Sequence, residues 1–151
     1  KRLAARYTQL LADWSGPAAA GRVLVDKNPG ALLLTPVLRR LVPGAALIIA
    51  LRDPRDVVLS CYMRYLKENL WSIDFLTPEL TAQRYAFEIG GWLRLRESLG
   101  PPFVEVRYED VVRNMPGQAQ RVIETLGLPW DDAVLDPGAS PGRIVASPTY
   151  A

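Results

Sequence analysis

A short apolar run that breaks into a charged, proline-containing turn constrains the fold of this chain more than any other feature. Residues 46–51 read Ala-Leu-Ile-Ile-Ala-Leu, which is typical of a buried strand, and the next five residues read Arg-Asp-Pro-Arg-Asp. Asp53 is a good helix cap, and Pro54 suits the first helical position because its missing N–H would be unpaired there anyway. The pattern predicts a strand that ends near Arg52 and a helix that begins directly after it.

Arg52 and Ser60 make this strand-to-helix turn a candidate anion site. Arg52 falls where the buried strand surfaces, and its planar guanidinium has the donor fork that matches a phosphate. Ser60 lies about two helical turns further on, where its hydroxyl can turn back toward the same anion. The alternative is that Arg52 forms an ordinary loop ion pair with Asp53 or Asp56. In that case Ser60 is a small residue that packs on the sheet.

Length and composition exclude several classes of protein. The 151 residues fit one domain with a real core, and a formal charge of +2 argues against a broad surface for nucleic acid. The absence of histidine excludes imidazole catalysis and His-ligated zinc, and a single cysteine, Cys61, excludes an intrachain disulfide. No apolar run approaches the roughly 18 residues of a membrane span. We expect a cytoplasmic protein that uses no metal.

Helical and strand-like segments alternate along the chain, which implies an α/β fold with a parallel sheet. The expected helices cover residues 2–15, 32–41, 57–66, 78–99 and 118–126, and the expected strands cover residues 23–25, 46–51 and 103–106. Ligands bind such sheets at the carboxyl ends of the strands. Polar clusters fall at those ends, at residues 26–27, 52–53 and 107–110.

The domain organisation follows from these elements. Residues 1–21 form a leading helix and turn, residues 22–135 form the α/β core, and residues 136–151 form a loop tail rich in proline and glycine. Within the core, Gly90-Gly91 predicts a close contact of the long helix, and Trp130 is expected to pack beneath the sheet. Neither of these two features predicts chemistry.

Five short segments in one order carry a resemblance to a known family. They are Asp26-Lys27-Asn28-Pro29, Arg52-Asp53-Pro54-Arg55-Asp56 through Ser60, Val106-Arg107-Tyr108-Glu109-Asp110, Leu126-Gly127-Leu128-Pro129-Trp130 and Ser147-Pro148-Thr149-Tyr150-Ala151. From about residue 22 onward the chain resembles the sulfotransferase family, especially its bacterial and tyrosylprotein sulfotransferase-like branch. The resemblance implies a P-loop-kinase-like α/β fold. It also implies the donor 3′-phosphoadenosine 5′-phosphosulfate (PAPS), which gives its sulfuryl group to an alcohol, phenol or amine and leaves 3′-phosphoadenosine 5′-phosphate (PAP).

The resemblance assigns roles to the strand-end residues. Arg52 and Ser60 match the pair that binds the 3′-phosphate of the donor, and Tyr108 matches a tyrosine beside the adenine. Lys27 matches a catalytic lysine near the transferring group, where a cation is needed because negative charge builds on the bridging oxygen. The alternatives are a solvated lysine paired with Asp26 and a core tyrosine whose hydroxyl caps a loop.

The matching residues in the tail and after the third expected strand imply less about donor binding. Ser147 or Thr149 matches a serine that contacts the donor in the tyrosylprotein branch, although both could belong to an ordinary loop tail. Arg107, Glu109 and Asp110 are expected to cap and brace the helix that follows them rather than to touch a ligand.

The sequence departs from the family at its start. Nothing in it resembles the phosphosulfate loop, a Pro-Arg/Lys-Ser-Gly-Thr-Thr-like segment that cradles the 5′ end of the donor with backbone N–H groups. The chain begins at Lys1 without a methionine. We therefore expect a fragment whose missing N-terminal part carries this loop and the general base. Such a fragment is inactive alone, although its parent is a PAPS-dependent sulfotransferase.

Two other functions stay open on the sequence. One is another P-loop-like phosphotransferase of the nucleotide kinase type, although the chain has no Gly-x-x-x-x-Gly-Lys-Ser/Thr segment. The other is a non-catalytic α/β binding module, in which the apolar region from Trp71 to Phe75 serves a protein partner. The acceptor of a sulfotransferase also stays open among a small molecule, a carbohydrate and a protein tyrosine. Residues 67–80 are the expected wall of its pocket.

Overall fold

A two-stranded parallel sheet lies at the centre of the computed structural model, which describes residues 2–16, 22–63 and 72–136. The strands are β1 (Leu47–Leu51) and β2 (Phe103–Arg107). The helices, in chain order, are α1 (Arg2–Ser15), η2 (Pro29–Leu34), α2 (Thr35–Leu41), α3 (Pro54–Tyr62), η3 (Ser72–Phe75), α4 (Pro78–Leu95), α5 (Tyr108–Arg113), α6 (Met115–Thr125) and η4 (Asp132–Leu135).

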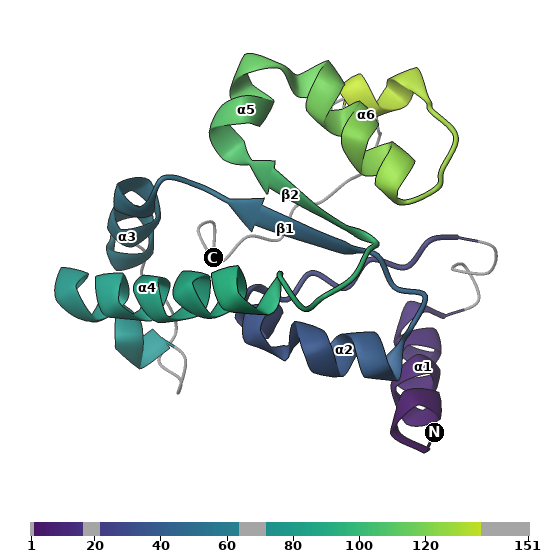
Figure 1. The fold of residues 1–151 in the computed structure, drawn as a ribbon, viewed down its shortest axis with the longest axis horizontal. Helices are drawn as coiled ribbons and strands as arrows, with labels where there is room; N and C mark the ends of the chain where they lie inside the picture. The colour runs from purple at the N-terminus through teal and green to yellow at the C-terminus, as the bar shows by residue number, and fades with distance from the viewer. Residues whose placement is uncertain (1, 17–21, 64–71, 137–151) are drawn as a thin grey trace.

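Helices flank the sheet on both sides. Figure 1 shows α5 and α6 on one side of the strands and α2, α3 and α4 on the other, with α1 beside α2. The chain leaves β1, passes through α3 and α4, and returns as β2 in the parallel direction. This confirms the α/β class with a parallel sheet flanked by helices.

Short polar side chains start the helices. Asp53 and Thr77 accept hydrogen bonds from the backbone N–H groups of the first turns of α3 and α4, and a proline follows each cap. These two caps satisfy N–H groups that have no partner inside the helix. Both helix starts were predicted from the sequence, and both are confirmed. Asn28, Asn114 and Asp131 cap η2, α6 and η4 in the same way.

The predicted strand at residues 23–25 is wrong. Residues 22–28, named here the Lys27 segment, have no regular secondary structure, and their apolar side chains Val23, Leu24 and Val25 are exposed. An extended segment becomes a strand only when a neighbour pairs its N–H and C=O groups, and no described residues supply that neighbour. Only two of the three polar clusters therefore lie at the end of a strand.

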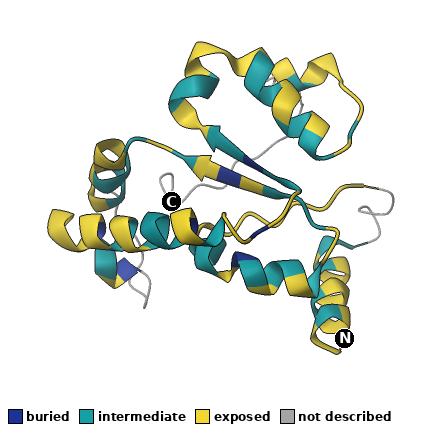
Figure 2. Cartoon of the chain, in the orientation of Figure 1, coloured by how far each residue is buried: buried dark blue, intermediate teal, exposed yellow. Residues whose placement is uncertain are grey.

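The core lies between the sheet and α4. Ile49, Trp92 and Leu99 form a buried cluster, and Trp92 is 0% exposed. The Trp92 ring meets Phe103 of β2 edge-on, with ring centroids 5.6 Å apart, and its Nε1 donates to Glu105 at 2.7 Å. Trp92 thus fixes α4 to β2, and Figure 2 shows buried residues on the strands and on α4, with others at separate places in α2 and η3.

Gly91 confirms the predicted close contact of the long helix. A Cβ at Gly91 would overlap the side chain of Leu33 in η2, whereas a Cβ at Gly90 would meet only the end of Arg94, at 4.0 Å. An alanine at position 91 would therefore force the Leu33 side chain to shift, whereas an alanine at position 90 would not displace a neighbour.

Several boundaries and one packing expectation differ from the sequence predictions. α4 ends at Leu95 rather than at residue 99, and α6 begins at Met115 because Asn114 caps it and Pro116 occupies its first turn. Trp130 is 42% exposed and donates its Nε1 hydrogen to Asp132 at 2.8 Å, so it does not pack beneath the sheet. The short helices α5 and η4 were not predicted. Within the described ranges, no helix has the length and apolar character to cross a membrane.

Candidate functional site

Residues 52–56, which connect β1 to α3 and include the first residues of α3, lie at the carboxyl end of the sheet and are named here the Arg52 turn. The Asp53 carboxylate receives hydrogen bonds from the Arg55 side chain at 3.0 and 2.8 Å and from the Arg55 backbone N–H at 2.9 Å. These bonds lower the pKa of Asp53 to about 2. The helix cap is therefore ionised at neutral pH.

The guanidinium of Arg52 is held along one edge and on one face. Its Nε and Nη2 donate to the Asp56 carboxylate at 3.3 and 3.0 Å, and its central carbon lies 4.6 Å from the centroid of the Tyr108 ring. An arginine has five N–H donors, and Asp56 takes two of them, so three remain. In the described parts of the chain no group accepts these three, and the side chain is 40% exposed.

The strand register explains why Arg52 and Tyr108 meet. Leu51 pairs with Arg107 at the ends of the two strands, so the next residue of each strand falls at the same level of the sheet. Arginine over an aromatic face is a favourable cation–π contact. Tyr108 is 51% exposed, which rules out its alternative role as a core aromatic residue.

The Arg52–Asp56 ion pair is the loop pair that the sequence left open as an alternative. It occupies one edge of the guanidinium and leaves the other donors available, so it does not exclude an anion. Ser60 is partly buried in α3, and its hydroxyl makes no hydrogen bond to Arg52 among the described residues. Shared binding of one phosphate by Arg52 and Ser60 stays a prediction.

Two side chains from other elements bind the backbone of the Arg52 turn. Glu109, in the first turn of α5, accepts the N–H of Asp53 at 2.9 Å, and the Tyr85 hydroxyl of α4 donates to the carbonyl of Arg52 at 3.0 Å. The backbone hydrogen bond from Asp53 lowers the pKa of Glu109, and burial raises the pKa of Tyr85. At neutral pH Glu109 is therefore ionised and can accept its hydrogen bond, and the Tyr85 hydroxyl keeps the proton that it donates.

Sequence reasoning found only part of this bracing. It assigned Glu109 to the support of the helix that follows β2, whereas Glu109 accepts a hydrogen bond from the turn after β1 and α5 has no side-chain cap at Arg107, and it missed Tyr85. Tyr85 lies 33 residues from Arg52 in the chain and belongs to no local pattern. The only signal was indirect, because a tyrosine hydroxyl near the interior of a helix needs a partner when it packs against a sheet end.

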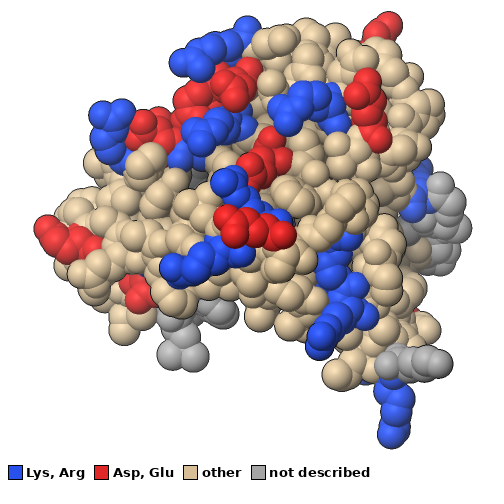
Figure 3. All heavy atoms as spheres, in the orientation of Figure 1, with Lys and Arg blue, Asp and Glu red and all other residues tan. Residues whose placement is uncertain are grey.

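A cavity of about 430 Å³ adjoins the Arg52 turn, between α4 and the start of α5. Four arginines contribute positive charge to its lining and three carboxylates contribute negative charge: Arg52, Arg96, Arg107 and Arg113 against Asp53, Glu109 and Asp110. Arg107 makes no ion pair within the described residues. Leu51, Ile89 and Leu93 provide an apolar wall. Charge beside an apolar wall is a typical composition of a small-molecule site. Figure 3 shows acidic and basic side chains interleaved over this face of the molecule.

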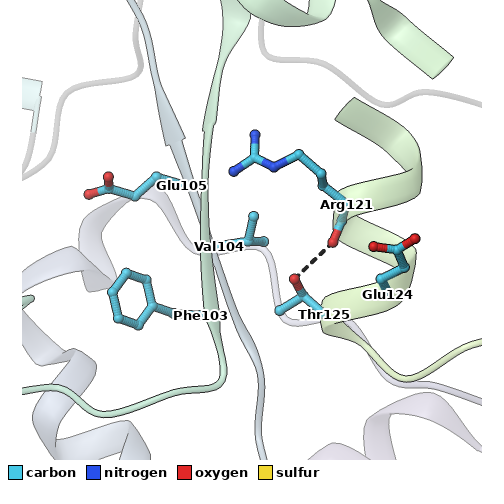
Figure 4. A pocket seen from close by; sticks show the side chains of 6 residues that line it. All are labelled: Phe103, Val104, Glu105, Arg121, Glu124 and Thr125. Atoms are coloured by element: carbon cyan, nitrogen blue, oxygen red, sulfur yellow. Dashed lines mark hydrogen bonds between the residues drawn. The ribbon is translucent and has the colours of Figure 1, made fainter. Parts of the chain in front are cut away.

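A second cavity, of about 410 Å³, lies between β2 and α6 (Figure 4). Its polar side chains already have partners within the protein: Arg121 donates to Gln118 at 2.6 Å, and Thr125 donates to the carbonyl of Arg121 at 2.8 Å. Glu105 points away from Arg121 in Figure 4 and accepts hydrogen bonds from Trp92 and Arg96. This cavity has the properties of a packing gap rather than of a site.

Lys27 lies in the exposed Lys27 segment and forms no ion pair with a described residue. Its neighbour Asp26 instead accepts a hydrogen bond from the Tyr7 hydroxyl of α1 at 2.7 Å, and this bond raises the pKa of Tyr7. The Asp26–Lys27 pair, which was the alternative for Lys27, therefore does not form.

Other predicted site residues cannot be placed. Ser147 and Thr149 lie outside the described residues, as do residues 67–71 of the expected acceptor wall. Phe75 of that wall is partly buried in η3. Across residues 2–16, 22–63 and 72–136, no group of three or more His, Cys, Asp or Glu side chains is arranged to hold a metal ion.

Comparison with known proteins identifies the family. The model of the sulfotransferase family matches residues 2–132. The chain is 29% identical over 113 residues to protein-tyrosine sulfotransferase A of Caenorhabditis elegans, an alignment that covers 74% of this chain and 29% of the relative. It is 30% identical over 108 residues to human sulfotransferase 2B1, covering 66% of this chain and 27% of the relative. The mouse sulfotransferase 2B1 is 30% identical over 100 residues, covering 60% and 29%.

The chain belongs to the sulfotransferase family, which suggests a transferase. No solved structure matches it significantly. The chain corresponds to 29% or less of the length of these curated relatives.

Proposed function

We propose that this chain carries the 3′-phosphate-binding half of a PAPS-dependent sulfotransferase. Family membership supports a donor and an acceptor in general terms, and the site supplies the more specific argument. When bound, PAPS supplies the sulfuryl group that a hydroxyl or amine acceptor receives. The relatives carry different names, protein-tyrosine sulfotransferase and sulfotransferase 2B1, so the proposal extends to a protein tyrosine, a carbohydrate or a small alcohol as acceptor.

The observation that carries the proposal is the Arg52 guanidinium at the carboxyl end of β1. Its face rests on Tyr108, one edge is fixed by Asp56, and three N–H donors are left for an anion. A phosphate oxygen accepts such charged hydrogen bonds well, and Ser60 adds a hydroxyl from α3. Adenine would stack on the exposed part of the Tyr108 ring, beside the cavity at the ends of the two strands.

The catalytic part of the proposal concerns Lys27. Its ammonium would offset the negative charge that develops on the leaving phosphate oxygen during transfer. Ser147 and Thr149 are proposed as further donor contacts from the tail. The phosphosulfate loop and the general base would come from parts of the protein outside this sequence, so the donor site of the isolated chain is incomplete and the chain alone is proposed to be inactive.

Isothermal titration calorimetry with PAP tests this function on the full-length natural protein that contains the chain. A charged hydrogen bond contributes roughly 1.5–3 kcal/mol, so Arg52→Ala should weaken PAP binding about ten- to a hundredfold. Arg55→Ala is the matched control, because Arg55 belongs to the same turn but pairs with Asp53 and is more exposed. It should leave PAP affinity nearly unchanged.

Two outcomes would contradict the proposal. Equal PAP affinity of wild type and Arg52→Ala would remove Arg52 from the site. Tighter binding of ATP than of PAP by the wild-type protein would favour a nucleotide kinase instead.

A further inference from the structure

We propose that Glu109 and Tyr85 are positioning residues, which hold Arg52 in the orientation that a nucleotide 3′-phosphate requires. The inference rests on the proposed function, because it names the groups that set the geometry of the same site. Neither side chain needs to touch the nucleotide in order to act. They act through the backbone on either side of the bond between Arg52 and Asp53.

The carbonyl of Arg52 and the N–H of Asp53 belong to one peptide group. Tyr85 donates to the oxygen of this group at 3.0 Å, and Glu109 accepts from its nitrogen at 2.9 Å. A peptide group is planar, so bonds to both of its ends fix the orientation of the whole plane. That orientation sets the direction in which the Arg52 side chain leaves the backbone.

The same short helix also fixes the Arg52 side chain. Tyr108, the residue next to Glu109 in α5, lies under the guanidinium at 4.6 Å. The first turn of α5 thus holds Arg52 in two ways. Glu109 binds the backbone next to Arg52, and the ring of Tyr108 lies against its guanidinium. A displacement of this turn would move the backbone and the side chain of Arg52 together.

Electrostatics alone predict the opposite effect of Glu109 on an anion. Its negative charge lies near the Asp53 carboxylate, and their repulsion opposes the lowering of the Glu109 pKa. A carboxylate beside a phosphate site should weaken phosphate binding, so its removal should strengthen binding. A positioning role predicts that removal of the Glu109 side chain weakens binding, and the sign of the effect separates the two explanations.

Paired titrations of the full-length natural protein with PAP and with adenosine 5′-phosphate test the inference. Only PAP carries the 3′-phosphate, so loss of Arg52 geometry should affect PAP and spare adenosine 5′-phosphate. Tyr85→Phe and Glu109→Ala should each reduce the preference for PAP by about five- to tenfold. Glu109→Gln should restore most of the preference, because its amide oxygen can still accept the Asp53 N–H.

Matched controls use side chains that have no hydrogen-bond partner in the described part of the chain. Tyr62→Phe removes a hydroxyl near the end of α3, and Glu97→Ala removes an exposed carboxylate after α4. Both should keep the wild-type preference. A merely destabilising substitution would weaken both nucleotides alike, so the ratio of the two affinities distinguishes positioning from loss of folding.

The possible failures are distinguishable. If the wild-type protein binds both nucleotides equally, the proposed function is wrong and the positioning role is wrong with it. If wild type prefers PAP and Arg52→Ala abolishes the preference, but Tyr85→Phe and Glu109→Ala both retain it, only the positioning role is overturned. A tighter PAP complex in Glu109→Ala would also overturn it.

Discussion

The Arg52 turn and the Lys27 segment look alike in the sequence and differ in the structure. In each, charged residues follow a short apolar run and come within a few residues of a proline, Pro54 in the first case and Pro29 in the second. The Arg52 turn follows a paired strand and is bound by side chains from α4 and α5. The Lys27 segment contains no strand, and among the described residues its side chains bond to other elements only at Asp26, which accepts from Tyr7 of α1, and at Asn28, which caps η2. A similar local sequence therefore gives a braced turn in one place and an exposed segment in the other.

The difference teaches that strand pairing, rather than loop composition, prepares a binding site at a sheet end. The paired strands bring Arg52 and Tyr108 to the same level, and the neighbouring helices then reach the turn between them. The Lys27 segment is fixed at its last residue, Asn28, which caps η2, and η2 in turn packs against α4 through Leu33 at Gly91. The orientation of Lys27 consequently depends on contacts at some distance along the chain.

The largest expected effect comes from Trp92, which packs against the sheet that leads into the Arg52 turn. Trp92→Ala removes a fully buried ring and its hydrogen bond to Glu105, and it should lower the free energy of unfolding by about 3–5 kcal/mol. Trp14→Ala is the control, since Trp14 is 88% exposed, and it should change stability by about 0.5 kcal/mol or less. Urea denaturation measures both. Similar losses in the two variants would disprove the placement of the core.

An intermediate effect on stability is expected at Gly91, and it should affect the Lys27 segment more than the Arg52 turn. Gly91→Ala forces the side chain of Leu33 in η2 to shift within a packed contact, and it should destabilise the protein by about 1–3 kcal/mol. Because η2 anchors the Lys27 segment, trypsin cleavage after Lys27 should accelerate more than cleavage after Arg52. Gly90→Ala has room for its Cβ and should stabilise by up to about 1 kcal/mol, through helix propensity. Equal effects at the two glycines would contradict the predicted contact.

The smallest expected effect is a pH dependence confined to the Arg52 turn. Hydrogen bonds from Arg55 lower the pKa of Asp53 from 3.8 to about 2, and the bond from Asp53 lowers that of Glu109 below 4.5. Their contribution to stability is thus complete above the unfolded-state pKa values and is lost as the pH falls through the lower folded-state values. Urea denaturation between pH 2 and pH 5 should show a shallower acid loss in Asp53→Asn and Glu109→Gln. If the free energy of unfolding fell with pH as steeply in both variants as in wild type, the ionised states assigned to Asp53 and Glu109 would be wrong.

Most of the fold could be predicted from the sequence because its signals are local. Asp53-Pro54 and Thr77-Pro78 specify helix starts through groups within one turn of each other, and β1 and β2 are marked by apolar runs. The strand at residues 23–25 was predicted from the same kind of apolar run. It failed because an apolar run specifies a strand only when another strand is available to pair with it.

The candidate site was predicted in part. Arg52 and Tyr108 were each selected from their positions after a strand, but their contact follows from the register of the sheet, which the sequence does not state. Tyr85 could not be selected, because its role depends on how α4 lies across the end of β1. Side chains that act through contacts far apart in the chain leave no periodic or local pattern.

The sequence by itself determined the family, the alternation of helices and strands, and the charged turn that follows β1, because each depends on residues close together in the chain. Only the tertiary structure decided that the peptide group between Arg52 and Asp53 is hydrogen-bonded at both its oxygen and its nitrogen. It also decided that the side chain of Asp26 bonds to Tyr7 and not to Lys27. The physical reason is that these hydrogen bonds join segments far apart in the chain, so they depend on tertiary packing, such as that of Trp92 against β2, which fixes where those segments lie.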